Sequence, residues 1–257
     1  QNKMGVIRNV PPKKPDFLLE KKHFPTQNRT ILYQGVLNPG RGIKPMISAL
    51  KYIENLDLVI IGYGKVEQEL KEFVVDEKMS DRVHFLGRID RDVLLNYTKL
   101  ATLGMVLEEP LGLSFTFSLP NKLFDFIHAG IPIVAGNMPE ISRIINQYKV
   151  GVIVDDYTPK KIAKKINELL EDQTLLAAIK KNQQEAKEIL CWETEAKKLE
   201  TEGKKIIHLS LGQPDFKSPK HVVDATKKAL DDGHHGYVLP NGIIECREAV
   251  TRKIKKL

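Results

Sequence analysis

Short apolar segments alternate with amphipathic segments through the first two thirds of this 257-residue chain, and this alternation restricts the fold more than any other feature. The apolar segments suit buried strands, and the segments between them repeat apolar residues at helical spacing. The predicted strands cover residues 30–35, 56–61, 83–86, 103–106, 131–135 and 151–154. The predicted helices cover residues 43–53, 66–76, 90–100, 139–148 and 159–170, with another inside 118–136 and one long polar helix over 173–199. Strands joined through helices run parallel, so we predict an α/β fold with a doubly wound, parallel, Rossmann-like sheet.

The loops that follow the predicted strands are the expected place for a site. Ligands bind to doubly wound sheets at the carboxyl ends of the strands. The loops 35–42, 62–65, 87–89 and 107–122 all share that edge of the predicted sheet.

The stretch 118–136, SLPNKLFDFIHAGIPIVAG, predicts a loop, a helix and a strand in succession. Pro120 disfavours helix before it, and Asn121 stands where an N-cap would. Apolar residues follow at helical spacing up to Gly130, which tolerates the left-handed conformation that ends many helices. Lys122 lies in the first turn. Because free N–H groups and the positive end of the helix dipole face one place, this helix N-terminus predicts an anion site.

The same stretch fits the pattern P-N-K-L-F-[DE]-[FY]-x-x-A-G-x-P-[IV]-[VI]. In this pattern the chain resembles the donor-site signature of group 1 (family 4) glycosyltransferases of the GT-B fold. The resemblance implies that residues 29–199 form the C-terminal, nucleotide-sugar-binding domain of such an enzyme. Residues 1–28 contain VIRNVP, which resembles the hinge before that domain, so we expect the acceptor domain to be absent from this sequence.

No Asp-x-Asp pair occurs in a suitable loop, so a metal is not implied at the site for the donor diphosphate. An enzyme without a metal must neutralise the leaving diphosphate with cations and helix dipoles. Arg41 lies in the first loop after a strand, where related enzymes place a cation, and Lys122 lies in the signature helix. We expect this pair, with Asn121 and Gly35, to bind the diphosphate. The alternative is that both cations are merely exposed charges at helix starts.

Asp125 is the expected contact for the ribose. It stands where the family usually has the second glutamate of a Glu-x(7)-Glu pattern, and its shorter side chain is a departure from that pattern. We expect Gly62, Gly64 and Gly87 to help bind the ribose or base, because glycine permits a close approach of the backbone.

The sugar end of the motif is incomplete in this sequence. The first carboxylate of the family pattern would fall at Phe117. Glu108 or Glu109 is the candidate substitute, and an ordinary acidic pair on the surface is the alternative. No Asp-x-Asp pair or nucleophile–base pair stands out, so we predict no metal and name no catalytic residue. His84 and His128 are interpreted as structural histidines.

Residues 200–257 change character and resemble the N-terminal part of class I/II pyridoxal-phosphate aminotransferases. The segment contains LGQPDF followed by a predicted helix and GYVLPNGIIECREAV. Gly212 resembles the glycine near the substrate carboxylate in that family, and Tyr237 resembles the tyrosine that reaches a cofactor phosphate. The family's Schiff-base lysine is not in this sequence, so we expect no pyridoxal phosphate chemistry. A tail this short is expected to lack a core of its own, and either to be loose or to associate with another chain.

The net charge of +7 lies at the two ends of the chain. Residues 1–30 carry +5 and residues 200–257 carry +3, which leaves the predicted donor domain at −1. This distribution argues against a nucleic-acid partner. For the N-terminal cluster, contact with acidic lipid heads stays open beside ordinary solvation. Cys191 and Cys246 form no disulfide or metal pattern, and no signal peptide is visible, so we expect a cytoplasmic location, although Gln1 suggests that the natural start is missing.

We therefore predict a truncated glycosyltransferase, weak or inactive alone, that binds a UDP- or GDP-linked hexose for transfer to a glycan or lipid-linked acceptor. A non-catalytic fusion protein and a fragment of a pyridoxal-phosphate aminotransferase are the alternatives. The base, sugar, acceptor and oligomeric state are not specified by the sequence.

Overall fold

The computed structural model describes residues 8–13, 24–201, 219–233 and 243–255. The chain divides into two compact units, Gln1–Lys204 and Lys205–Leu257, which are described separately below.

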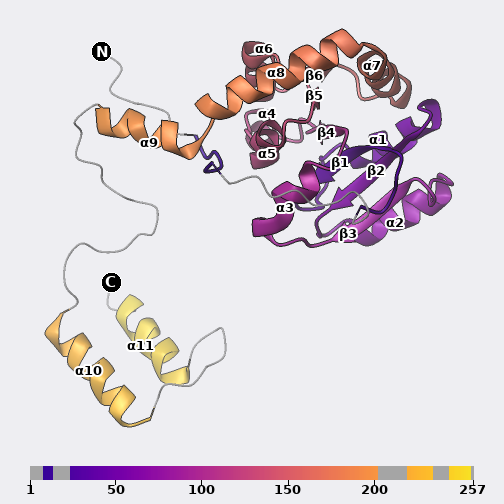
Figure 1. Ribbon diagram of the computed structural model, residues 1–257. Coiled ribbons are helices and arrows are strands. Elements are labelled where there is room, and N and C mark those ends of the chain that lie inside the picture. The colour runs from indigo at the N-terminus through magenta and orange to yellow at the C-terminus, as the bar shows by residue number, and fades with distance from the viewer. Residues whose placement is uncertain (1–7, 14–23, 202–218, 234–242, 256–257) are drawn as a thin grey trace. The chain divides into compact units, whose positions relative to one another are not determined.

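The first unit contains a six-stranded sheet in the order β3-β2-β1-β4-β5-β6 (Figure 1). All paired strands run parallel, and β1 pairs with β2 from Arg29↔Leu56 to Gln34↔Ile61. The strands are β1 (Arg29–Gln34), β2 (Leu56–Ile61), β3 (Val83–Gly87), β4 (Leu103–Val106), β5 (Ile133–Gly136) and β6 (Gly151–Val154). The parallel, Rossmann-like sheet predicted from the alternation is confirmed.

Helices cover both faces of this sheet, because successive strand side chains point to opposite sides. Ile31 and Tyr33 of β1 belong to one apolar cluster, and Leu32 between them belongs to the other. The first cluster includes residues of α1 (Ile43–Ala49), α2 (Glu67–Asp76) and α7 (Pro159–Glu171). The second includes residues of α3 (Arg91–Thr98), α5 (Asn121–Ala129) and α6 (Pro139–Tyr148), while α8 (Gln173–Ile189) contributes to both.

The predicted single helix over 173–199 is wrong. The chain breaks between α8 and α9 (Trp192–Thr201), at Leu190 and Cys191. Both of these residues are fully buried, so the break turns apolar side chains inward. Trp192, at the start of α9, has a side chain that is 47% exposed, and its backbone N–H donates to the Pro11 carbonyl oxygen at 3.0 Å.

The helix predicted over 43–53 is divided into α1 and the short 3₁₀ helix η2 (Leu50–Tyr52), and the short helix α4 (Leu113–Thr116) was not predicted. The described N-terminal residues pack on the first unit. Val10 and Phe24, both in the segment predicted as a hinge, are buried in the second apolar cluster.

The second unit is described only at two helices, α10 (Lys220–Asp231) and α11 (Ile244–Ile254). Neither helix contains a buried residue. Gly212 and Tyr237, the two aminotransferase-like residues, lie outside the described part of the chain. In the portion of the chain that the structure describes, every helix is too short or too polar to span a bilayer.

Candidate functional site

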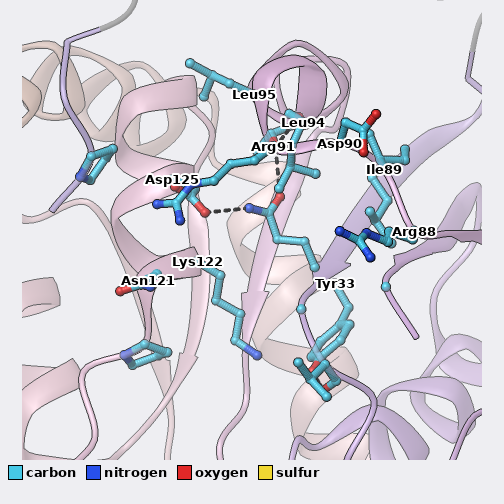
Figure 2. A pocket seen from close by; sticks show the side chains of 18 of the residues that line it. Tyr33, Arg88, Ile89, Asp90, Arg91, Leu94, Leu95, Asn121, Lys122 and Asp125 are labelled. Carbon is cyan, nitrogen blue, oxygen red and sulfur yellow. Dashed lines mark hydrogen bonds between the residues drawn. The ribbon is translucent and has the colours of Figure 1, made fainter. Parts of the chain in front are cut away.

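A pocket of about 660 Å³ lies at the carboxyl edge of the sheet, where the loops after β1, β2 and β3 meet α3 and α5. Of the residues predicted for the donor site, the pocket is lined by Gly35, Arg41, Gly62, Asn121, Lys122 and Asp125. The fold therefore brings residues that are far apart in the sequence, such as Tyr33 and Asp125, to one pocket (Figure 2).

Two cations of the pocket wall share one buried carboxylate. The Lys122 ammonium lies 2.8 Å from Glu108 Oε1, and Arg41 Nη1 pairs with Glu108 Oε2. Glu108 is fully buried and is not part of the pocket wall, whereas Arg41 and Lys122 both line the pocket. One carboxylate and two cations leave this cluster with a charge of about +1, which favours an anionic ligand.

Lys122 is not an exposed charge, because only 7% of the residue is accessible. Its ammonium lies 4.1 Å from the centre of the Tyr33 ring, a cation–π contact that Figure 2 shows at the base of the pocket. Burial lowers the pKa of Lys122, and the Glu108 carboxylate opposes that effect. Burial and the same carboxylate raise the pKa of the Tyr33 phenol, so it stays neutral while its hydroxyl donates to the Val36 carbonyl at 2.8 Å.

The N-terminus of α5 opens onto the pocket, with Pro120 at the N-cap. The expected N-cap role of Asn121 is therefore wrong. Asn121 is the first helical residue, and its Oδ1 instead accepts a hydrogen bond from Asn9 Nδ2 at 3.2 Å. Gly130 ends the helix with φ of 72°, as predicted. The positive end of the helix dipole adds to the charge of Lys122 and Arg41.

Asp125 is held by a chain of side-chain hydrogen bonds from neighbouring elements. Gln34 Nε2 donates to Asp125 Oδ2 at 2.9 Å, and the Thr98 hydroxyl donates to Gln34 Oε1 at 2.8 Å (Figure 2). These bonds fix the orientation of the Gln34 amide and link β1, α3 and α5 at the pocket wall.

The loop glycines allow a close approach of backbone to backbone. Gly62 has φ of 142°, and a Cβ there would lie 1.9 Å from the Gly35 carbonyl oxygen. The Gly62 N–H donates to the Gly87 carbonyl at 2.8 Å. A Cβ at Gly64 would lie 2.3 Å from the Leu37 carbonyl oxygen. Gly64 and Gly87 do not line the pocket, and their contacts hold the three loops together.

The two candidate sugar carboxylates have different surroundings. Glu108 is the buried counter-ion described above, so the interpretation of both as an acidic surface pair does not hold for it. Glu109 Oε1 accepts the N–H of Gly42 at 3.1 Å. Neither glutamate lines the pocket.

Several pocket residues were not identified from the sequence. They are Tyr33, Gln34, Arg88, Asp90 and Arg91, and all of them lie at or just after the ends of β1 and β3. Arg88 stacks over the Tyr63 ring at 5.8 Å. The position of Arg88, Asp90 and Arg91 directly after a predicted strand was the signal that could have identified them.

The two histidines lie in different places. His128 lines the pocket, its Nε2 lies 2.8 Å from the Leu190 carbonyl oxygen, and burial lowers its pKa. His84 Nε2 lies 3.2 Å from Asp57 Oδ2, away from the pocket wall. Within the described residues, no group of three potential metal-ligating side chains is found.

The sequence matches the family described as glycosyl transferases group 1 over residues 16–186, more than half of the chain. It is 26% identical over 175 residues to a GDP-mannose-dependent alpha-(1-6)-phosphatidylinositol monomannoside mannosyltransferase of Mycobacterium tuberculosis, covering 63% of this chain and 43% of the relative. Its fold is similar to that of HepE from Anabaena, solved in complex with UDP and glucose. That similarity has a TM-score of 0.58 at 18% identity, over 72% of this chain and 51% of HepE. The chain thus spans about half the length of these two proteins, or less.

A different relative matches a shorter part of the chain. The (5-formylfuran-3-yl)methyl phosphate transaminase of Methanocaldococcus jannaschii is 48% identical over 60 residues, which cover 23% of this chain and 16% of the transaminase. The resemblance to a fragment of an aminotransferase is therefore confirmed. A match of this length establishes no site for pyridoxal phosphate.

Proposed function

Because the chain belongs to the glycosyl transferases of group 1, we propose that the pocket at the sheet edge binds the nucleoside diphosphate of a sugar donor for hexosyl transfer. The diphosphate contacts Arg41 and Lys122 near the N-terminus of α5, with Asn121 and Gly35 beside them. The observation that carries the proposal is this pair of cations, which converge on one wall of the pocket from two separate elements.

The remaining parts of the donor are assigned to neighbouring walls. Asp125, oriented by Gln34, accepts hydrogen bonds from the ribose hydroxyls. The base lies toward the loop after β3, where Gly62 and Gly87 hold the backbone. Glu108 and Glu109 were expected near the sugar, and their contacts favour support of the diphosphate site instead.

The chemistry asked of these residues is electrostatic. When the bond between the sugar and the diphosphate breaks, negative charge grows on the departing phosphate oxygens. Fixed cations in a partly dry site stabilise that charge without reorganising during the reaction. Arg41 supplies planar guanidinium donors and Lys122 a compact ammonium, which suits two adjacent phosphate groups.

The acceptor is proposed to be a glycan or a lipid-linked saccharide, and the donor a UDP- or GDP-linked hexose. The mannosyltransferase relative is named for a GDP-mannose donor, and HepE was solved with UDP. We expect weak transfer by this chain alone, since it spans only 43% of the mannosyltransferase relative. Pyridoxal phosphate is not proposed as a cofactor. A cytoplasmic location is proposed because Cys191 and Cys246 are both free thiols.

Calorimetric titration of UDP and GDP into the full chain tests the proposal. The variants Arg41→Ala and Lys122→Met are compared with Arg143→Ala and Lys51→Met, which break ion pairs to Glu140 and Glu77. A hydrogen bond to a charged group is worth about 1.5–3 kcal/mol, so each pocket variant should weaken binding by about tenfold to 150-fold. The control variants should bind as the wild type does. No saturable heat with either nucleotide, or unchanged affinity in both pocket variants, would contradict the proposal.

A further inference from the structure

Glu108 is a fully buried carboxylate that faces two cations of the pocket and yet does not line the pocket. We propose that Glu108 is a positioning residue, which keeps Lys122 charged and fixed for an incoming diphosphate without contacting that ligand. This inference rests on the function proposed above. It adds to the proposed diphosphate site a residue that contacts the two cations and not the ligand.

The backbone around Glu108 is firmly held. The Tyr157 hydroxyl donates to the Glu108 carbonyl at 2.6 Å. A Cβ at Gly42 would lie 2.3 Å from the Leu107 carbonyl oxygen, so the loop after β1 packs directly against the residue before Glu108. The backbone of Glu108 is therefore held in place, and its carboxylate reaches both cations from that position.

The two oxygens of Glu108 divide the cations between them. Oε1 faces Lys122 at 2.8 Å and Oε2 pairs with Arg41 Nη1. Both cations line the pocket. An ammonium and a guanidinium each have more donors than one carboxylate oxygen can accept, so each cation keeps donors for a ligand. The ligand approaches from the open side and does not need to displace Glu108.

Lys122 depends on this carboxylate for its charge. Burial disfavours the charged form of an ammonium, and a buried lysine without a compensating anion gives up its proton. Around the Lys122–Glu108 pair, Arg41 adds repulsion toward Lys122, and the phenols of Tyr33 and Tyr157 stay neutral. The neighbouring Glu109 carboxylate accepts the Gly42 N–H. Among the described residues, Glu108 is the carboxylate within ion-pair distance of Lys122.

The first test measures Lys122 in the ligand-free protein. The side-chain signals of ¹³C-labelled lysine are followed against pH in the wild type, in Glu108→Gln and in Glu77→Gln, with Lys122→Met to assign the signal. Glu77 is the control because its carboxylate also pairs with a lysine, Lys51 at 3.0 Å, away from the pocket wall. We expect Glu108→Gln to lower the pH at which Lys122 titrates by about one to three units. Glu77→Gln should leave it unchanged.

The second test follows nucleotide binding between pH 7.5 and 9, a range in which the terminal phosphate of UDP or GDP is ionised. Wild-type affinity should stay nearly constant. In Glu108→Gln the affinity should fall by up to about tenfold for each pH unit, because binding then requires Lys122 to take up a proton. The double variant Glu108→Gln/Lys122→Arg should lose this dependence, since arginine keeps its charge.

Three results would overturn the role of Glu108. Lys122 could titrate identically in the wild type and in Glu108→Gln, or Glu108→Gln could bind nucleotide more tightly at every pH, which would make Glu108 a competitor of the phosphate. Should Glu108→Gln fail to fold, a Lys122 already neutral below pH 8 in the wild type would refute the inference without it. Loss of the proposed function is distinguishable, because it appears as a wild type that binds no nucleotide whatever the state of Lys122.

Discussion

The two units of this chain contain similar amphipathic sequences, but among the described residues only those of the first unit are buried. Every residue of β2 is buried, and apolar clusters fill both faces of the sheet. In the second unit, α10 and α11 leave Leu230 and Ile254 more than half exposed. Helical periodicity is thus insufficient for a core, because the apolar face also needs a second surface to pack against.

The ion pairs of the two units also differ in burial. Lys220 and Lys228 pair with Asp224 and Asp232 four residues away on the exposed surface of α10, or at its end. Such pairs contribute little to stability. The Glu108–Lys122 pair is buried beneath a pocket, where an unpaired charge would be costly. The chemistry of the chain is therefore expected in the first unit.

Removal of one large apolar side chain from each kind of environment gives the largest expected contrast. Phe126 is fully buried and Leu230 is 54% exposed. Phe126→Ala should lower the free energy of unfolding by about 3–5 kcal/mol, through lost burial and a residual cavity. Leu230→Ala should change it by less than about 0.5 kcal/mol. Urea denaturation followed by far-UV circular dichroism, which reports the helices of both units, measures both changes, and equal effects would contradict the contrast.

Two glycines with positive φ sharpen the comparison at the level of the backbone. Gly62→Ala would place its Cβ 1.9 Å from the Gly35 oxygen, whereas a Cβ at Gly233 meets nothing within 4 Å. Gly62→Ala should therefore cost about 1–3 kcal/mol and weaken nucleotide binding, because the loops after β1 and β2 must separate. Gly233→Ala should alter neither the unfolding transition nor binding. Normal binding by Gly62→Ala would show that these loops do not form the site.

The burial of His128 predicts a modest dependence of stability on pH. The unfolded chain binds a proton at its imidazole near pH 6.5, whereas burial holds the pKa of His128 below that value in the folded protein. Between these two pH values the unfolded state binds more protons, so the free energy of unfolding falls as pH falls. His128→Gln should flatten this slope between pH 7 and pH 5.5 in urea denaturation. His221→Gln on the exposed surface of α10 is the control, and an unchanged slope in His128→Gln would refute the assignment.

Removal of the second unit should have the smallest effect. A chain that ends at Lys204 retains all of the described sheet and the pocket. We expect its unfolding free energy and nucleotide affinity to stay within about 0.5 kcal/mol of the full chain. A larger loss would mean that the second unit covers part of the first.

The strands were predictable from sequence because buried parallel strands are continuous apolar runs, and β2 occupies the predicted residues. The break at Leu190 and Cys191 was not, because no glycine or proline marks it and tertiary burial decides it. In the site, the pattern around Lys122 identified a cation at a helix start. It could not show which of Glu108 and Glu109 is buried, or that Gln34 orients Asp125, since both depend on contacts between distant strands and helices.

Mapping of backbone amide signals during titration of the full chain with UDP and GDP tests the central claim most directly. The account predicts saturable shifts in the loops after β1, β2 and β3 and at the N-terminus of α5, with the amides of α10 and α11 unchanged. Shifts confined to α10 and α11, or no saturable shifts with either nucleotide, would contradict the assignment of the pocket as a donor site.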